Sequence, residues 1–321
     1  MSRRTDRADE GLLQDNYAAL NADFYEGKPW VYFDRRLMHV ARLAADPEGY
    51  HDALDEAVRL GPMEVAQVRR APADDEPSGL DDQSFVAAEA QVLLHHTAET
   101  LLRLLHAHAP PSSGDFPACP WLTLSRVTSP RQFKGWVRSR VLDSSADERQ
   151  RVVEDVFAGT LDSDLDVETV ATHIRLSARH FLEADSYNAA KHGFALQGSH
   201  SRLDVEVENV VAFEAQGLTI AWLAVRGQDP RWVRTTRWFS VEATLALAFF
   251  ATRLIRGLWE SARHRYLDEP ISPELRVPDP SDLFGAFNVP DAVLAEREEP
   301  LWYEGVERTM TVRKTVRRPG A

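Results

Sequence analysis

Three polar side chains, Asp185, Asn188 and His192, follow one another at the spacing of a single helical face. They continue an apolar stripe that includes Ile174 and Phe181, and in a helix of about 3.6 residues per turn all five fall within a narrow sector. Such a stripe packs inward, where an unpaired polar group costs roughly 1–3 kcal/mol. The trio is therefore predicted to form either a buried network that fixes the histidine tautomer or the lining of a pocket for a small polar ligand.

A second set of reactive side chains, Tyr187, Lys191 and His180, lies on a different face of the same predicted helix. Histidine transfers protons near neutral pH, and a lysine can hold an anion. Lys191 is one of only four lysines in a chain that otherwise uses arginine for positive charge. The alternative is a cation that complements the last helical turn, with Gly193 as the C-terminal cap. We expect this face to contact something outside the fold.

The helix predicted over residues 84–108 carries a polar row opposite its apolar face. The row consists of Glu89, His96, Glu99, Arg103 and His106. It is either a set of metal or acid/base groups, or an exposed face held by pairs such as Glu99 and Arg103. We favour the exposed face, because a fixed cation lies within the row and the chain has neither His-Glu-x-x-His nor paired Glu-x-x-His motifs. The sequence therefore predicts no metal site and no cofactor.

The helices and strands predicted around these residues indicate a mainly α fold of the α+β class. The candidate site lies on a long helix predicted over residues 166–192, and period-2 alternation follows it. Strands are predicted at 203–208, 218–225 and 232–239, and Ser240 then caps a largely apolar helix over 241–266. The expected architecture is a helical bundle with a three-stranded antiparallel β-meander inserted before the last core helix.

Three parts of the chain are expected to form separate regions. They are an N-terminal helical cap at 1–72, with helices at 10–25, 35–45 and 50–60, a main helical domain at 84–267 with the meander at 203–239, and a Pro-rich extension at 268–321 with a basic tail. The basic residues between Arg308 and Arg318 alternate with Thr and Val, a pattern that an edge strand could have, but we favour a solvated tail.

Composition restricts the class of partner. The net charge is −13, with 50 acidic against 37 basic residues, so the overall field disfavours RNA as a partner and leaves a protein partner or a second copy of this chain. The longest apolar stretch, Ala243–Thr252, is far shorter than the roughly 20 residues that span a bilayer, so no membrane association is expected. The single cysteine, Cys119, and the charged N-terminal segment predict a cytoplasmic protein.

The Asn-x-x-Lys-His-Gly sequence that ends the long predicted helix, together with an Arg followed by His five residues later, resembles the HEPN superfamily over residues 84–266 at most. The spacing occurs at Arg175–His180 and at Arg103–His108. The resemblance implies a bundle of four or five helices that is either a metal-independent ribonuclease, with Arg and His acting on the scissile phosphate, or a binding and dimerisation module. Residues five apart on a continuous helix point about 140° apart, so a shared pocket requires a break between them.

Three functional hypotheses follow. The first is an interaction or ligand-binding module, with the polar cluster at Asp185 as a structural or binding site. The second is a HEPN-like ribonuclease in which His180 or His192 is the acid/base and Arg175 or Lys191 holds the phosphate. The third is a metal-dependent hydrolase, which the missing ligand motifs place last.

Overall fold

The chain is described from a computed structural model. The described residues are 15–54, 58–60, 63–65, 80–110, 115–127, 129–161, 164–183, 185, 189, 196–207, 210–226, 231–271, 275, 295–300 and 311–314.

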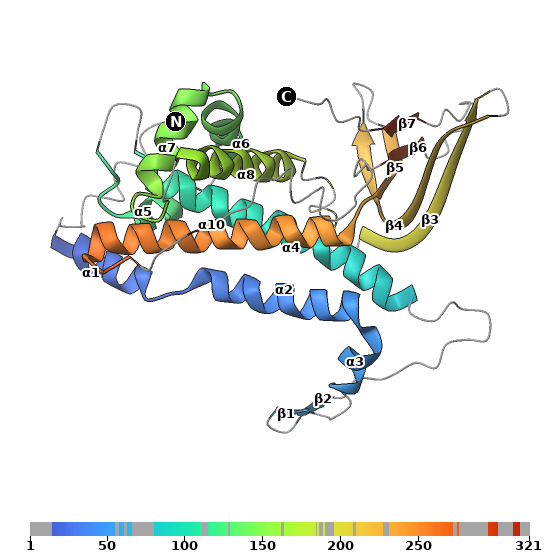
Figure 1. Cartoon of the computed structure of the whole chain (residues 1–321), viewed down its shortest axis with the longest axis horizontal. Coiled ribbons are helices and arrows are strands. Elements are labelled where there is room, and N and C mark those ends of the chain that lie inside the picture. The colour runs from blue at the N-terminus through green and yellow to red at the C-terminus, as the bar shows by residue number, and fades with distance from the viewer. Residues whose placement is uncertain are drawn as a thin grey trace. The chain divides into compact units, whose positions relative to one another are not determined.

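Helices dominate the described residues. They are α1 (Asp15–Tyr25), α2 (Pro29–Ala45), α3 (Pro47–Asp52), α4 (Leu80–His108), α5 (Pro120–Ser125), α6 (Pro130–Val137), the π-helix η1 (Arg138–Leu142), α7 (Ala146–Val156), α8 (Asp164–Leu182) and α10 (Val241–Leu267) (Figure 1). None of them is long and apolar enough to cross a membrane. The predicted mainly α fold, with an antiparallel sheet before the last helix, is confirmed.

Seven strands accompany these helices in the described residues. They are β1 (Val58–Leu60), β2 (Met63–Val65), β3 (Leu196–Val207), β4 (Val210–Arg226), β5 (Arg231–Trp238), β6 (Ala295–Pro300) and β7 (Thr311–Lys314). β1 and β2 pair with each other, and the others form one antiparallel sheet in the order β3-β4-β5-β6-β7. The predicted meander is β3-β4-β5. The basic C-terminal residues at Thr311–Lys314 form the edge strand β7 and not the solvated tail that the sequence favoured.

The chain forms two compact units. A helical unit comprises Met1–Asp34, His96–Leu182 and Phe249–Pro280, and a sheet unit comprises Arg35–His95, Glu183–Ala248 and Ser281–Ala321. The helices α2, α4 and α10 each contribute residues to both units. The predicted boundaries near residues 72, 84 and 267 stay a prediction.

The core of the helical unit lies between α4, α8 and α10. Its fully buried side chains include Leu101, Leu102 and Leu105 of α4, Val170 and Ala178 of α8, and Leu254, Ile255 and Leu258 of α10. The apolar stripes predicted for these helices are therefore the packed faces. In the same unit α7 packs against α8 (Figure 1).

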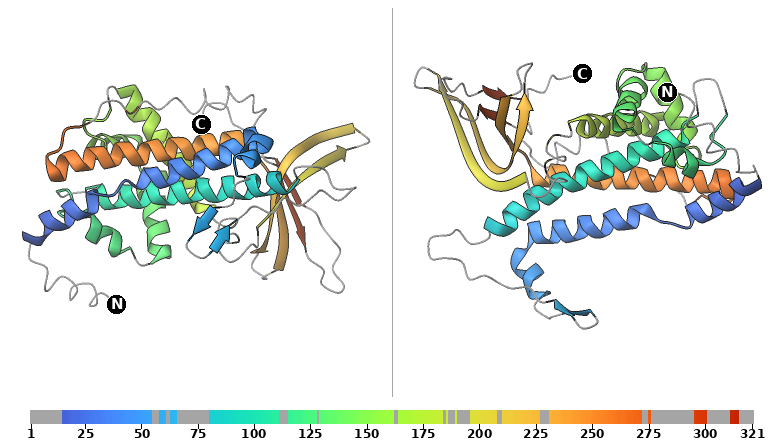
Figure 2. Two further views of the ribbon diagram at one scale, coloured as in Figure 1. Left: turned by 90° about the horizontal axis from the view of Figure 1, so that it is seen from below. Right: turned by 180° about the vertical axis from the view of Figure 1, so that it is seen from behind.

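The core of the sheet unit lies on one face of the sheet. Its buried residues are Ile220, Trp222 and Ala224 of β4, Val233 of β5, Val40 and Leu43 of α2, Val86, Ala87 and Ala90 of α4, Phe239, and Val241 of α10. β3 and β4 are long and curved, as Figure 2 shows from two sides. β3 approaches α4 so closely that a Cβ on Gly198 would lie 2.1 Å from the Ser84 carbonyl oxygen.

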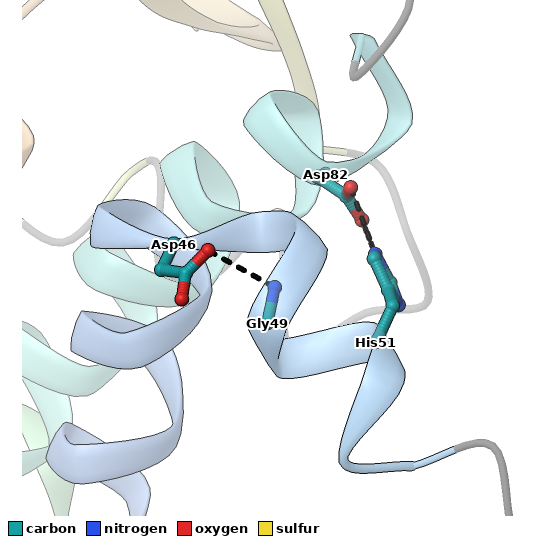
Figure 3. A network of polar contacts seen from close by, with 4 residues as sticks. All are labelled: Asp46, Gly49, His51 and Asp82. Carbon is teal, nitrogen blue, oxygen red and sulfur yellow. Dashed lines mark hydrogen bonds and ion pairs between the residues drawn. The ribbon is translucent and has the colours of Figure 1, made fainter.

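The helix predicted at 50–60 is wrong in its second half. α3 ends at Asp52, and Val58–Leu60 forms β1. α3 begins at an Asp46 cap, whose carboxylate accepts a hydrogen bond from the Gly49 amide at 3.0 Å. His51 at its end forms an ion pair with Asp82 of α4 at 2.9 Å (Figure 3). These contacts hold a helix of only six residues.

The long helix predicted over residues 166–192 is also wrong at its C-terminal end. α8 ends at Leu182, and Glu183 is not helical. Among the described residues that follow, Asp185 and Ala189 are again helical, so the predicted helix is broken at Glu183. The 3.6-residue stripe is therefore interrupted before it reaches the polar trio.

Candidate functional site: a polar cavity on the sheet

The predicted inward trio does not continue the buried stripe. Ile174 and Phe181 are buried as expected, but Asp185 is exposed: the helix is interrupted at Glu183, and Asp185 is helical again beyond this break. The inward orientation predicted for Asp185 is wrong. Asn188 and His192 lie outside the described residues.

The second predicted face is described only at one of its three residues. His180 lies in the last turn of α8 and is partly buried, whereas Tyr187 and Lys191 lie outside the described residues. The structure therefore leaves the convergence of these three side chains a prediction.

Neither Arg–His spacing forms a convergent pair within the chain. α8 is continuous through Arg175 and His180, so their side chains leave its axis about 140° apart. His108 is completely buried, and its Nε2 lies 2.8 Å from the Tyr25 hydroxyl. Arg103 instead forms an ion pair with Glu99 at 2.7 Å, as predicted for the polar row.

Metal-ligating side chains do not gather in the described part of the chain. No three or more His, Cys, Asp or Glu side chains there are arranged to hold a metal ion. Cys119 is buried, as is usual for an unpaired structural cysteine.

A cavity of about 470 Å³ lies instead on the sheet. It is lined by Gln197, Gly198, Ser199, Ser201 and Arg202 of β3, Thr219 and Ala221 of β4, and Arg234, Thr236 and Trp238 of β5. Its volume is within the range of roughly 300–1,000 Å³ that is typical of small-molecule sites.

Strand register explains why these side chains share a face. Ser199 is opposite Thr219, and Thr219 is opposite Trp238. Two residues further along β4, Ala221 is opposite Thr236 of β5. Side chains alternate between the two faces of a strand, so these residues lie on one face while Ile220 and its neighbours enter the core on the other.

Hydrogen bonds hold the floor of the cavity in place. The Ser201 hydroxyl donates to Thr219 Oγ1 at 3.3 Å, and Thr219 in turn donates to the Ser199 carbonyl at 3.2 Å. Trp238 Nε1 reaches across β4 and donates to the Ser201 carbonyl at 3.0 Å. Thr219 and Trp238 are almost fully buried, so the floor is preformed.

The charge of the cavity is positive. Arg234 of β5 lies on the same face as Thr219, whereas Arg202 follows Ser201 on β3 and alternates toward the opposite face, so it lines only the edge of the cavity. No acidic residue is among the lining residues that the structure describes. Arg234 is exposed and forms no hydrogen bond or ion pair with the described residues. Arg237, on the opposite face, has a packing role: it lies over the Trp222 ring at 5.3 Å and 3.8 Å from the Glu183 carboxylate. Of these two β5 arginines, Arg234 is therefore the one that faces the cavity, and its cross-strand neighbour on β6 is Glu299.

Comparisons with known proteins leave the functional interpretation to this geometry. No protein-family model, no curated protein and no solved structure matches the chain.

One pattern in the sequence corresponds to this site, although it is not a recognisable motif. Small hydroxyl side chains recur with period 2 at Ser199 and Ser201, and an Arg and a Thr recur at Arg234 and Thr236. A solvated outer face has the same pattern, and only the strand register brings the three strands' residues together.

Proposed function

We propose that this chain is a ligand-binding module whose site is the cavity on the β3-β4-β5 face. Its ligand is a small molecule that carries a carboxylate or phosphate group. The observation that supports the proposal is the charge of the lining: Arg234 on the cavity face, with Arg202 at its edge and no acidic residue among the described lining residues, in a chain of net charge −13. Because the chain as a whole repels anions, a positive cavity selects for them locally.

The chemistry of the lining favours binding over turnover. Guanidinium groups form paired, charge-assisted hydrogen bonds to carboxylates and phosphates. Ser199 and Thr236 add neutral hydroxyls, and Gln197 adds an amide that can orient the rest of the ligand. The described lining has no His, Cys, Lys, Asp or Glu to act as a base or nucleophile. We therefore place the interaction or ligand-binding hypothesis first, with the sheet cavity as its site.

Isothermal titration calorimetry tests the proposal. Wild-type protein is titrated with citrate, AMP and pyrophosphate at constant ionic strength, and the titrations are repeated with Arg234→Gln. We expect at least one probe to bind the wild type and Arg234→Gln to bind it at least roughly tenfold more weakly, because a charged hydrogen bond is removed.

The matched control is Arg35→Gln, which changes the same charge at an exposed position of α2 in the same unit. It should bind as the wild type does. Equal affinities for the wild type and Arg234→Gln with every probe that binds, or no binding of any probe, would contradict the proposal.

The HEPN-like ribonuclease is the second candidate, and Arg175 is the residue that favours it. Its guanidinium is partly buried and its Nε has no hydrogen-bond partner, which suits a phosphate ligand. Mixed RNA incubated with wild type, His180→Ala and His192→Ala tests this hypothesis. RNA cleavage by the wild type that both variants retain in full would contradict it, as would no cleavage by the wild type.

The remaining expectations rest on composition alone. A metal-dependent hydrolase ranks third, and elemental analysis of protein purified without chelator tests it. The single buried Cys119 supports a cytoplasmic location.

A further inference from the structure

Three arginines gather where α7 packs against α8 in the helical unit. Arg175 and Arg179 are one turn apart on α8 and lie on the same side of it. Arg149 of α7 extends the buried row that includes Val153, and α7 and α8 are in contact. Both Arg149 and Arg179 lie close enough to Arg175 to lower the pKa of its guanidinium, after the larger effect of burial.

The described residues do not neutralise this cluster. Arg175 and Arg179 form no ion pair or hydrogen bond with the described residues, and the buried Nε of Arg175 has no acceptor. Arg149 donates to the Ser144 carbonyl, which carries no net charge. Like charges at this spacing repel one another, so their arrangement is unfavourable unless an anion joins them.

Three other arginines of the same unit form ion pairs with carboxylates. Arg103 binds Glu99, Arg256 binds Glu260, and Arg263 binds Glu269. The chain has 50 acidic residues available for such pairs. Within the described residues, Arg175 and Arg179 lack the carboxylate partner that these three arginines have.

We propose that Arg149, Arg175 and Arg179 form a second binding site, separate from the sheet cavity, that holds a phosphate group. Phosphate fits because its oxygens accept several charge-assisted hydrogen bonds at once, and arginine presents planar pairs of donors to them. The partly buried Arg175 supplies the inner donors, and the more exposed Arg179 supplies the outer ones. The site does not depend on the function proposed for the sheet.

Calorimetry in an Arg234→Gln background tests the second site, because binding in the sheet cavity is then weakened. The probes are pyrophosphate and a short RNA with or without a 5′-phosphate, at constant ionic strength. We expect Arg175→Gln to weaken binding of the phosphate probe at least roughly tenfold, since charged hydrogen bonds are lost. Binding of pyrophosphate identifies a free phosphate compound as the source, and binding of only the 5′-phosphorylated RNA identifies a nucleic-acid end.

Arg151→Gln is the matched control, because Arg151 is exposed on α7 and points about 200° away from Arg149. It should bind as the background protein does. If Arg175→Gln does not fold, as judged by circular dichroism, the exposed Arg179→Gln replaces it and should also bind more weakly. The proposal is overturned if the folded variant binds as tightly as the background protein, or if no probe binds. It is also overturned if the only binding is of RNA, and that RNA binds equally with and without its 5′-phosphate. A loss of binding caused by Arg234→Gln alone reports on the sheet cavity. The proposal for each site can therefore be contradicted without affecting the other.

Discussion

The hydroxyl of Tyr25 lies 2.8 Å from Nε2 of His108, and both side chains are completely buried. Nδ1 of the same ring is 2.7 Å from the Leu104 carbonyl, which can only accept, so Nδ1 carries the proton. Nε2 is therefore the acceptor and Tyr25 the donor. Tyr266 stacks on Tyr25 with ring centroids 5.7 Å apart, which closes the cluster. This hydrogen bond connects α1 to the end of α4 through a neutral histidine.

Tyr25→Phe should destabilise the fold while leaving the packing of the ring intact. The change removes the donor from a buried acceptor, which costs about 1–3 kcal/mol in the free energy of unfolding. Urea unfolding followed by circular dichroism measures it. Tyr17→Phe, a partly exposed position on the same helix, is the control and should change stability by less than about 0.5 kcal/mol. Equal stability of the two variants would show that the Tyr25–His108 bond contributes nothing.

Acid should weaken the fold through His108. Burial lowers the pKa of His108 from 6.5 to about 4, so the unfolded chain takes up this proton at a higher pH than the folded one. The contribution to stability is complete above pH 6.5, and it falls as the pH drops from 6.5 toward 4, by at most about 3 kcal/mol.

The measurement is the free energy of unfolding at pH 7.5 and pH 4.5 for wild type and His108→Gln. The carboxylates titrate in both proteins, so the difference between the two pH dependences isolates the histidine. We expect the smaller pH dependence in His108→Gln. Parallel curves would mean that His108 is protonated in the folded state.

The helices could be predicted where the residues that begin or end them are close in the sequence. The apolar stripe over residues 84–108 ends before Pro110, and α4 ends at His108. Ser240 was expected to cap the last helix, and its hydroxyl accepts a hydrogen bond from the Ala243 amide at 3.1 Å. Features that depend on distant segments were not predicted: β6 pairs with β5 although about sixty residues of chain separate them, and periodicity carries no information on such pairing.

The candidate site was less predictable than the fold. The polar trio depended on a helix that ran unbroken past Leu182, and the break at Glu183 leaves no mark on the 3.6-residue pattern of the sequence. The cavity on the sheet depends on which face the helices cover. Alternation in β4 separates Thr219 from Ile220, but only the packing of α4 on the Ile220 side decides which face stays open.

Gly198→Ala should destabilise the sheet unit. A Cβ at this position would lie 2.1 Å from the Ser84 carbonyl oxygen, and backbone cannot rotate away as a flexible side chain can. Separating β3 from α4 should cost about 1–3 kcal/mol, as other overpacked sites do. Chemical denaturation measures the change.

The control for Gly198 is Gly135→Ala, an exposed glycine of α6 with no described atom within 4 Å of the new Cβ. It should stabilise the protein by about 0.5–1 kcal/mol, because alanine favours a helix interior. Changes of the same sign at both positions would contradict the close approach of β3 and α4.

Thr235→Val should stabilise the protein. Thr235 is completely buried in the core face of β5, and its hydroxyl has no hydrogen-bond partner. Valine keeps the shape of the side chain, replaces the unpaired hydroxyl with a methyl group and favours a strand, so we expect a gain of roughly 1 kcal/mol in the free energy of unfolding. Thr244→Val is the matched control, because the Thr244 hydroxyl donates to the Ser240 carbonyl at 2.7 Å. That variant should lose stability. A loss at Thr235 as well would mean that its hydroxyl has a polar partner, and a buried water bound at the core face of the sheet would then be the first one to look for.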